Sequence, residues 1–120
     1  MPGDGVGRIN VERVGPSFWV VALDGEHDLS TVPALQDELA AIFALGTTVL
    51  IDLAGATFID SSVLAQLILA QRRVDEDENE QLALVAPEGG AAARLIDLVG
   101  VGRLFTIFQT RSDALRAVAG

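Results

Sequence analysis

The 120-residue sequence contains no cysteine. Disulfide bonds, thiolate metal sites and cysteine nucleophiles are therefore excluded, and the composition fits a reducing compartment. The acidic run around His27, residues 24–28 (DGEHD), is the one local candidate for a metal site. Its spacing matches no ligand pattern typical of zinc or calcium sites. We therefore expect no metal.

Basic residues are scarce and dispersed. Eight arginines or lysines stand against 17 acidic residues, which gives a net charge of −9. Nucleic-acid binding depends on a contiguous basic surface that neutralises phosphates. Because the bases are scattered along the chain, we expect no direct nucleic-acid partner.

Long apolar segments and phosphate-binding loops are missing as well. The first residues, MPGDG, lack the basic and apolar regions of a signal peptide, and the longest nearly uncharged stretch, 61–71, is too short to cross a bilayer. Neither G-x-x-x-x-G-K nor G-x-G-x-x-G occurs. We therefore expect a cytoplasmic protein without membrane insertion and without a cofactor.

The hydrophobic residues, 50% of the chain, fall into short runs separated by helical patterns. The runs predict strands near 9–12, 18–23, 48–53, 82–86 and 104–108, and the 3.6-residue periodicity between them predicts helices near 32–43, 64–73, 92–99 and 114–118. This order predicts one α/β domain over residues 1–120, with an ordered core of about 8–118. Its sheet is mixed and mostly parallel, with one antiparallel N-terminal edge strand and about four helices.

Two polar loops carry nearly all the candidate functional residues. They are residues 24–30, after the second predicted strand, and 57–62, after the third. Parallel α/β folds usually place their sites at the carboxyl ends of strands. If the two strands are neighbours, His27 and Asp28 lie close to Asp60 and Ser61.

The step Asp60-Ser61-Ser62 has two interpretations, and the sequence leaves both open. The first is a helix N-cap, in which a side-chain oxygen accepts from the free N–H groups of the first turn. The second is a phosphorylation site, since a helix N-terminus tolerates a phosphate and the added charge changes what the surface binds.

An enzymatic interpretation would join Ser61 and His27 to an aspartate in a hydrolase triad. Ser61 does not lie in a G-x-S-x-G turn, and no oxyanion hole is evident. We therefore expect no catalytic residues and no enzymatic activity.

Three stretches resemble the STAS domain family, of the anti-sigma-factor-antagonist type. They are residues 25–31 (GEHDLST), 49–62 (VLIDLAGATFIDSS) and 98–108 (LVGVGRLFTIF), and the likeness extends over about residues 8–118. The second stretch is the most specific, because it combines a strand, a turn and the Asp-Ser-Ser step.

The resemblance implies a partner-switching regulator of transcription. In that family the unphosphorylated domain binds an anti-sigma factor that is also a serine kinase, and phosphorylation of the first hydroxyl residue after the aspartate ends the complex. A phosphatase restores the active form. That residue is Ser61 here, and Asp28, Asp60 and Ser62 match the family's partner-binding surface.

Two positions differ from the family's usual pattern. Val63 stands where glycine is usual, and His27 replaces an aliphatic residue. We expect Val63 to face the partner beside Ser61 and to select a dedicated kinase. The alternative is that Val63 turns inward and packs in the core. We place His27 on the same surface as Ser61. The alternative function is an accessory or scaffold STAS subunit of a transport assembly, acting without phosphorylation.

Overall fold

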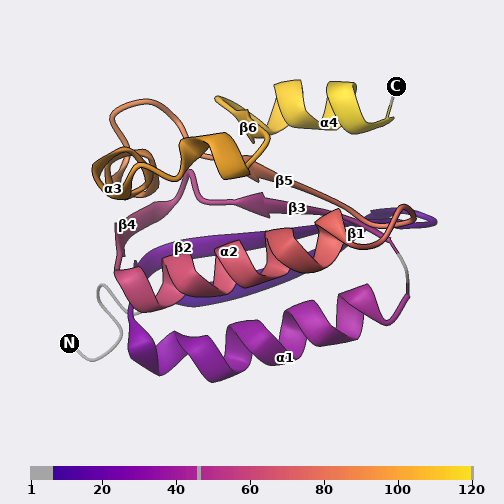
Figure 1. Ribbon diagram of the computed structural model, residues 1–120, viewed down its shortest axis with the longest axis horizontal. Helices are drawn as coiled ribbons and strands as arrows, with labels where there is room; N and C mark the ends of the chain where they lie inside the picture. Colours follow the sequence, from indigo (N-terminus) through magenta and orange to yellow (C-terminus); the bar gives the residue numbers. More distant parts are fainter. Residues whose placement is uncertain (1–6, 46, 120) are drawn as a thin grey trace.

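The computed structural model describes residues 7–45 and 47–119. Six strands and four α-helices alternate along the chain, as Figure 1 shows. In chain order the elements are β1 (Arg8–Gly15), β2 (Phe18–His27), the 3-10 turn η1 (Leu29–Thr31), α1 (Val32–Phe43), β3 (Thr48–Asp52), β4 (Ala56–Ile59), α2 (Ser61–Asp75), β5 (Gln81–Val85), α3 (Ala91–Val99), the 3-10 turn η2 (Gly102–Leu104), β6 (Ile107–Phe108) and α4 (Arg111–Ala119).

The sheet has the strand order β1-β2-β3-β5-β6, with β4 pairing to β2 away from this path. The β1–β2 pair is antiparallel, and every other pair is parallel. The predicted mixed sheet with one antiparallel N-terminal edge strand is therefore confirmed. Parallel pairing needs crossovers, which α1, α2 and α3 provide.

The central strands bury both of their faces, which explains their uninterrupted apolar runs. On β3, Val49 and Ile51 belong to the main core with α1, α2 and α3, whereas Leu50 belongs to a smaller cluster that includes Ala114 of α4. In Figure 1, α1 and α2 lie side by side, and α4 lies across the sheet from them.

Strand β4 is the strand that the sequence analysis missed. Residues 57–59 were included in a loop, but β4 pairs with the end of β2, in the register Glu26↔Phe58 and His27↔Ile59. Strand β2 itself continues to His27, four residues beyond its predicted end. Gly25, with a φ of 84°, lies at the register shift in this pairing, and that bulge allows the strand to continue.

No helix in the described part of the chain, residues 7–45 and 47–119, is long and apolar enough to span a membrane.

Candidate functional site

Two aspartate turns lie side by side at the carboxyl ends of β2 and β4. The parallel register pairs His27 with Ile59, and the backbone N–H of Asp60 donates to the carbonyl oxygen of His27 at 3.2 Å. The prediction that the two polar loops are neighbours is therefore confirmed. The strand that brings them together is β4 rather than β3.

Asp60 is the N-cap of α2. Its backbone is extended (φ −104°, ψ 178°), and its Oδ1 accepts from the N–H groups of Ser62 and Val63, at 3.0 and 3.2 Å. The same oxygen accepts the hydroxyl of Ser62 at 2.5 Å. The helix-cap interpretation of this step is correct. It does not exclude the second interpretation, because the residue between Asp60 and Ser62 is free of these bonds.

Asp28 makes the same kind of bonds in the neighbouring turn, after β2. Its Oδ1 accepts from the N–H of Ser30 at 2.9 Å and from the Ser30 hydroxyl at 2.5 Å. These bonds, the hydroxyl first, lower the pKa of the exposed Asp28 carboxyl below its usual 3.8. The spacing Asp-x-Ser occurs in both turns, and the sequence analysis overlooked the role of Ser30. In this repeat, Leu29 holds the position that Ser61 holds in the other turn.

The two serines after Asp60 have different surroundings. Ser61 is the first residue of α2 and is exposed, whereas Ser62 is half-buried. Within residues 7–45 and 47–119, the Ser61 hydroxyl takes part in no side-chain hydrogen bond, whereas the Ser62 hydroxyl is held by Asp60. A kinase approaching this surface would find the Ser61 oxygen available and the Ser62 oxygen already engaged.

The prediction that Val63 faces a partner is wrong. Its side chain is fully buried and belongs to the main core, together with Leu67 and Val74 of the same helix. Residues 63, 67, 70 and 74 fall on one face of α2 at helical spacing, so the third residue of the helix turns inward.

The placement of His27 on the partner surface is wrong as well. The imidazole is fully buried, because alternation along β2 turns it to the inside while Glu26 stays exposed. Its Nε2 lies 2.9 Å from the carbonyl oxygen of Asp24, and its Nδ1 faces Gly7, where a Cβ atom would come within 2.9 Å. The ring packs and orients the turn, and it is not presented to the Ser61 hydroxyl as a triad histidine would be.

A hollow of the structure lies away from these turns. It has a volume of about 480 Å³ and is lined by Asp77, Gln81 and Phe108 among others, at the carboxyl end of α2 and the amino end of β5. Ser61 begins the 15-residue helix at whose other end this hollow lies, a separation of roughly 20 Å at 1.5 Å per residue. Ser61 is therefore exposed at the end of α2 that lies away from this hollow.

The fold and this pair of turns agree with comparisons to known proteins. A family model described as Mlab, STAS domain, matches residues 13–107. The chain belongs to the STAS domain family. Among curated proteins, it is 32% identical over 102 residues to the anti-sigma-F factor antagonist RsfB of Mycobacterium tuberculosis, which covers 84% of this chain and 81% of RsfB.

Solved STAS structures have the same architecture. An anti-sigma factor antagonist from Mycobacterium paratuberculosis superposes with a TM-score of 0.86 at 29% identity, over 100% of both chains. The anti-sigma factor antagonist SpoIIAA in its unphosphorylated form gives 0.76 at 23% identity, over 94% of this chain and 97% of its own. The Bacillus SpoIIAA in its phosphorylated form gives 0.72 at 19%, over 92% and 99%. At these identities the SpoIIAA likeness concerns the fold alone.

Proposed function

We propose that this STAS domain is an anti-sigma-factor antagonist of the cytoplasm, which binds an anti-sigma factor with serine kinase activity and is switched off by phosphorylation of Ser61. The observation that carries the proposal is the contrast between the exposed, unengaged Ser61 hydroxyl and the Ser62 hydroxyl bound to Asp60 at 2.5 Å. The names of the relatives, anti-sigma-F factor antagonist and anti-sigma factor antagonist, support the choice of partner.

The capping bonds of Asp60 determine how a phosphate on Ser61 would act. The N–H groups of Ser62 and Val63 already donate to the Asp60 carboxylate, and the N–H of Leu64 donates to the Asp60 carbonyl oxygen at 3.1 Å. The helix N-terminus therefore has few donors left to neutralise a phosphate. The added charge of about −2 would remain on the surface, beside two carboxylates.

Such a dianion would oppose any interface that covers Ser61. Burying it would require its desolvation, and Asp28 and Asp60 would repel it. A loss of about 3 kcal/mol corresponds to two decades in affinity, which is sufficient for a switch. The fold itself need not change, because the phosphorylated and unphosphorylated forms of SpoIIAA both match this chain.

In this proposal the domain acts by binding, and its partners supply the chemistry: the anti-sigma factor transfers the phosphate and a phosphatase removes it. Asp28, Asp60 and Ser62 shape the surface that both partners approach. The buried His27 supports the absence of a hydrolase activity, since it is not available to activate Ser61.

The alternative is a scaffold STAS subunit of a transport assembly that works without phosphorylation. The curated relative RsfB is named an anti-sigma-F factor antagonist, which favours the first candidate. The two candidates differ in one measurable respect, the modification of Ser61.

The test is a pull-down from the native cytoplasm with the wild-type chain and the Ser61→Asp, Ser61→Ala and Ser62→Ala variants. The wild type should retain an anti-sigma factor and release it when ATP is added, and mass spectrometry should locate the phosphate on Ser61. Ser61→Asp should weaken binding about tenfold or more, Ser61→Ala should bind without release, and Ser62→Ala should still be phosphorylated. Phosphate on Ser62, or capture of transporter subunits with Ser61 unmodified, would contradict the proposal.

A further inference from the structure

Within residues 7–45 and 47–117, eight large apolar side chains are exposed, and four of them belong to elements near the Ser61 end of the molecule. Leu29 in η1 is 69% exposed and Phe58 in β4 is 48% exposed, and Leu98 and Val99 are at the carboxyl end of α3, which packs against β4. Single exposed apolar residues are common on protein surfaces. Leu29 and Phe58 are different, because each lies within two residues of one of the capping aspartates, Asp28 and Asp60.

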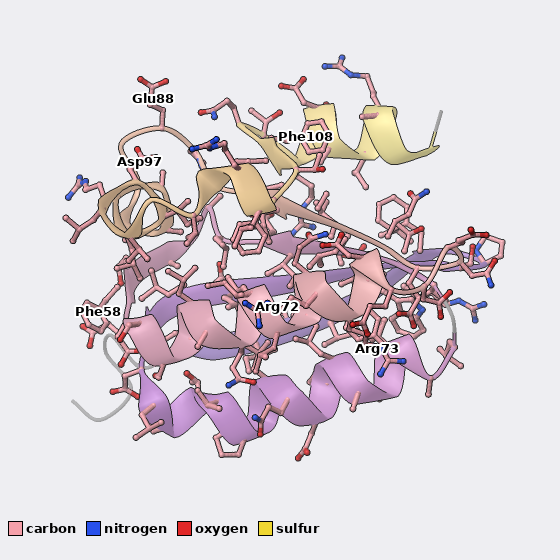
Figure 2. The ribbon with its side chains drawn as sticks, in the orientation of Figure 1. Phe58, Arg72, Arg73, Glu88, Asp97 and Phe108 are labelled. Atoms are coloured by element: carbon pink, nitrogen blue, oxygen red, sulfur yellow. The ribbon has the colours of Figure 1, made fainter. Side chains whose placement is uncertain are left out.

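Phe58 lies directly beside the N-terminus of α2. Figure 2 shows its ring at the end of the sheet where α2 begins, directed away from the body of the protein. The two residues that follow are the buried Ile59, which anchors the strand, and the cap Asp60. The buried Ile59 and the capped helix therefore fix the backbone that carries Phe58, three residues before Ser61.

Leu29 approaches the same spot from the neighbouring turn. It lies between Asp28 and Ser30 and is the counterpart of Ser61 in the repeated Asp-x-Ser turn. The two turns are joined by the bond from the Asp60 N–H to the His27 carbonyl, and η1 contacts α2. Leu29 thus lies in the turn after β2, and Phe58 lies on β4, the strand that leads to Ser61.

The carboxylates beside Ser61 are partly engaged within the domain. Oδ1 of Asp28 and Oδ1 of Asp60 accept hydrogen bonds from their own turns. The exposed apolar side chains on either side of them are a source of affinity that does not depend on charge. Large side chains held rigidly at the centre of an interface are the groups that usually dominate binding energy.

We infer that Phe58 and Leu29 are the apolar anchors by which this surface binds its anti-sigma factor, and that the partner offers an apolar recess to receive them on either side of Ser61. This inference rests on the proposed function, since it concerns the same partner. It separates two roles on one surface: the anchors provide affinity, and Ser61 provides the switch. A phosphate between the anchors would have to be dehydrated before either could be seated.

The experiment compares the affinities of Phe58→Ala, Leu29→Ala and the wild type for the anti-sigma factor retained in the pull-down, measured by titration calorimetry. Leu69→Ala is the matched control, because Leu69 is 55% exposed in the middle of α2, away from the switch. Phe58→Ala should weaken binding about thirtyfold and Leu29→Ala about tenfold, while Leu69→Ala stays within about twofold of the wild type. Phe58→Leu keeps a large apolar side chain and should retain most of the affinity. A loss in Phe58→Ala alone is then due to the missing apolar contact and not to misfolding.

Salt separates apolar anchoring from charge attraction. Raising the ionic strength from about 0.05 M to about 0.5 M should change the affinity of the unmodified chain less than about threefold, because apolar contact is not screened. Binding should also show a negative heat-capacity change, which Phe58→Ala diminishes.

The outcomes distinguish the inference from the proposed function. Wild-type affinity in both Phe58→Ala and Leu29→Ala, with Ser61→Asp still weakened, overturns the inference and leaves the proposed function standing. If Ser61→Asp also binds normally, or no anti-sigma factor is retained, the proposed function fails and the inference fails with it.

Discussion

The backbone N–H of Asp60 donates to the carbonyl oxygen of His27 at 3.2 Å, which ties the start of α2 to the end of β2. Each strand then ends in an aspartate whose carboxylate accepts from the serine two residues later. Ser61 therefore belongs to a double turn that is joined by backbone and side-chain hydrogen bonds.

The first prediction concerns the cap of α2. Asp60→Ala removes the acceptor of the Ser62 and Val63 N–H groups and should lower the free energy of unfolding by about 1 kcal/mol. Asp60→Asn should lose less, because asparagine also caps well. Urea unfolding monitored by circular dichroism measures the difference. Ser61→Ala is the control and should stay within about 0.5 kcal/mol of the wild type, and an equal loss in that variant would contradict the assignment of the cap.

The second prediction concerns the titration of Asp28. Its pKa is lowered by the hydrogen bonds from Ser30, so the folded state favours the ionised form. The associated stability is present above 3.8 and is lost as the pH falls through the lower pKa of the folded protein. Ser30→Ala should raise the pKa of Asp28 toward 3.8, as followed by NMR of the carboxyl carbon. Ser62→Ala, which removes the equivalent bond at Asp60, should leave Asp28 unchanged.

The third prediction follows from the burial of Val63. Val63→Ala should destabilise the protein by about 2 kcal/mol through lost burial and a small cavity, and Val63→Gly by about 3 kcal/mol. Ala65→Gly on the exposed side of the same helix isolates the backbone contribution, about 1 kcal/mol. Per folded molecule, Val63→Ala should bind the partner as the wild type does. A large loss of affinity without a loss of stability would return Val63 to the binding surface.

The fourth prediction concerns the packing on His27. A Cβ atom on Gly7 would lie 2.2 Å from the Glu26 carbonyl oxygen and 2.7 Å from Cε1 of His27. Backbone at this distance cannot move aside cheaply, so Gly7→Ala should cost about 1–3 kcal/mol. Gly102→Ala is the control, because its nearest contact would be an ordinary 3.7 Å. Equal thermal midpoints for the two variants would show that Gly7 does not need to be small.

The sequence was sufficient to predict the sheet, because the core strands are apolar on both faces and the helices are strongly periodic. It was insufficient for β4, a four-residue strand that has only Ala56 and Ile59 buried and therefore shows no alternation. The continuation of β2 was hidden by Asp24-Gly25, which normally signals a turn but here forms a bulge.

Within the site, Asp60, Ser61 and Asp28 could be placed by their position after strands, whereas Val63 and His27 could not. Val63 was compared with the family's glycine instead of being counted on the helical face with Leu67 and Val74, although the spacing was available in the sequence. The orientation of His27 follows from the alternation along β2, which continues to His27. The predicted strand ended at residue 23, so the direction of the His27 side chain could not be predicted. Phe58 was missed because an exposed aromatic side chain cannot be told from a buried one before the strand is known.

The capped first turn of α2 also affects how long a signal would last. Because Asp60 already accepts from the N–H groups of Ser62 and Val63, a phosphate at Ser61 would find few free donors in the domain and would break none of these bonds. The phosphorylated and unphosphorylated forms should then have similar unfolding rates and similar rates of degradation. A phosphatase would meet an ester on a native surface and would not have to wait for local opening. The lifetime of the phosphorylated state would be set by the rates of the kinase and the phosphatase, and one molecule could pass through many cycles of modification.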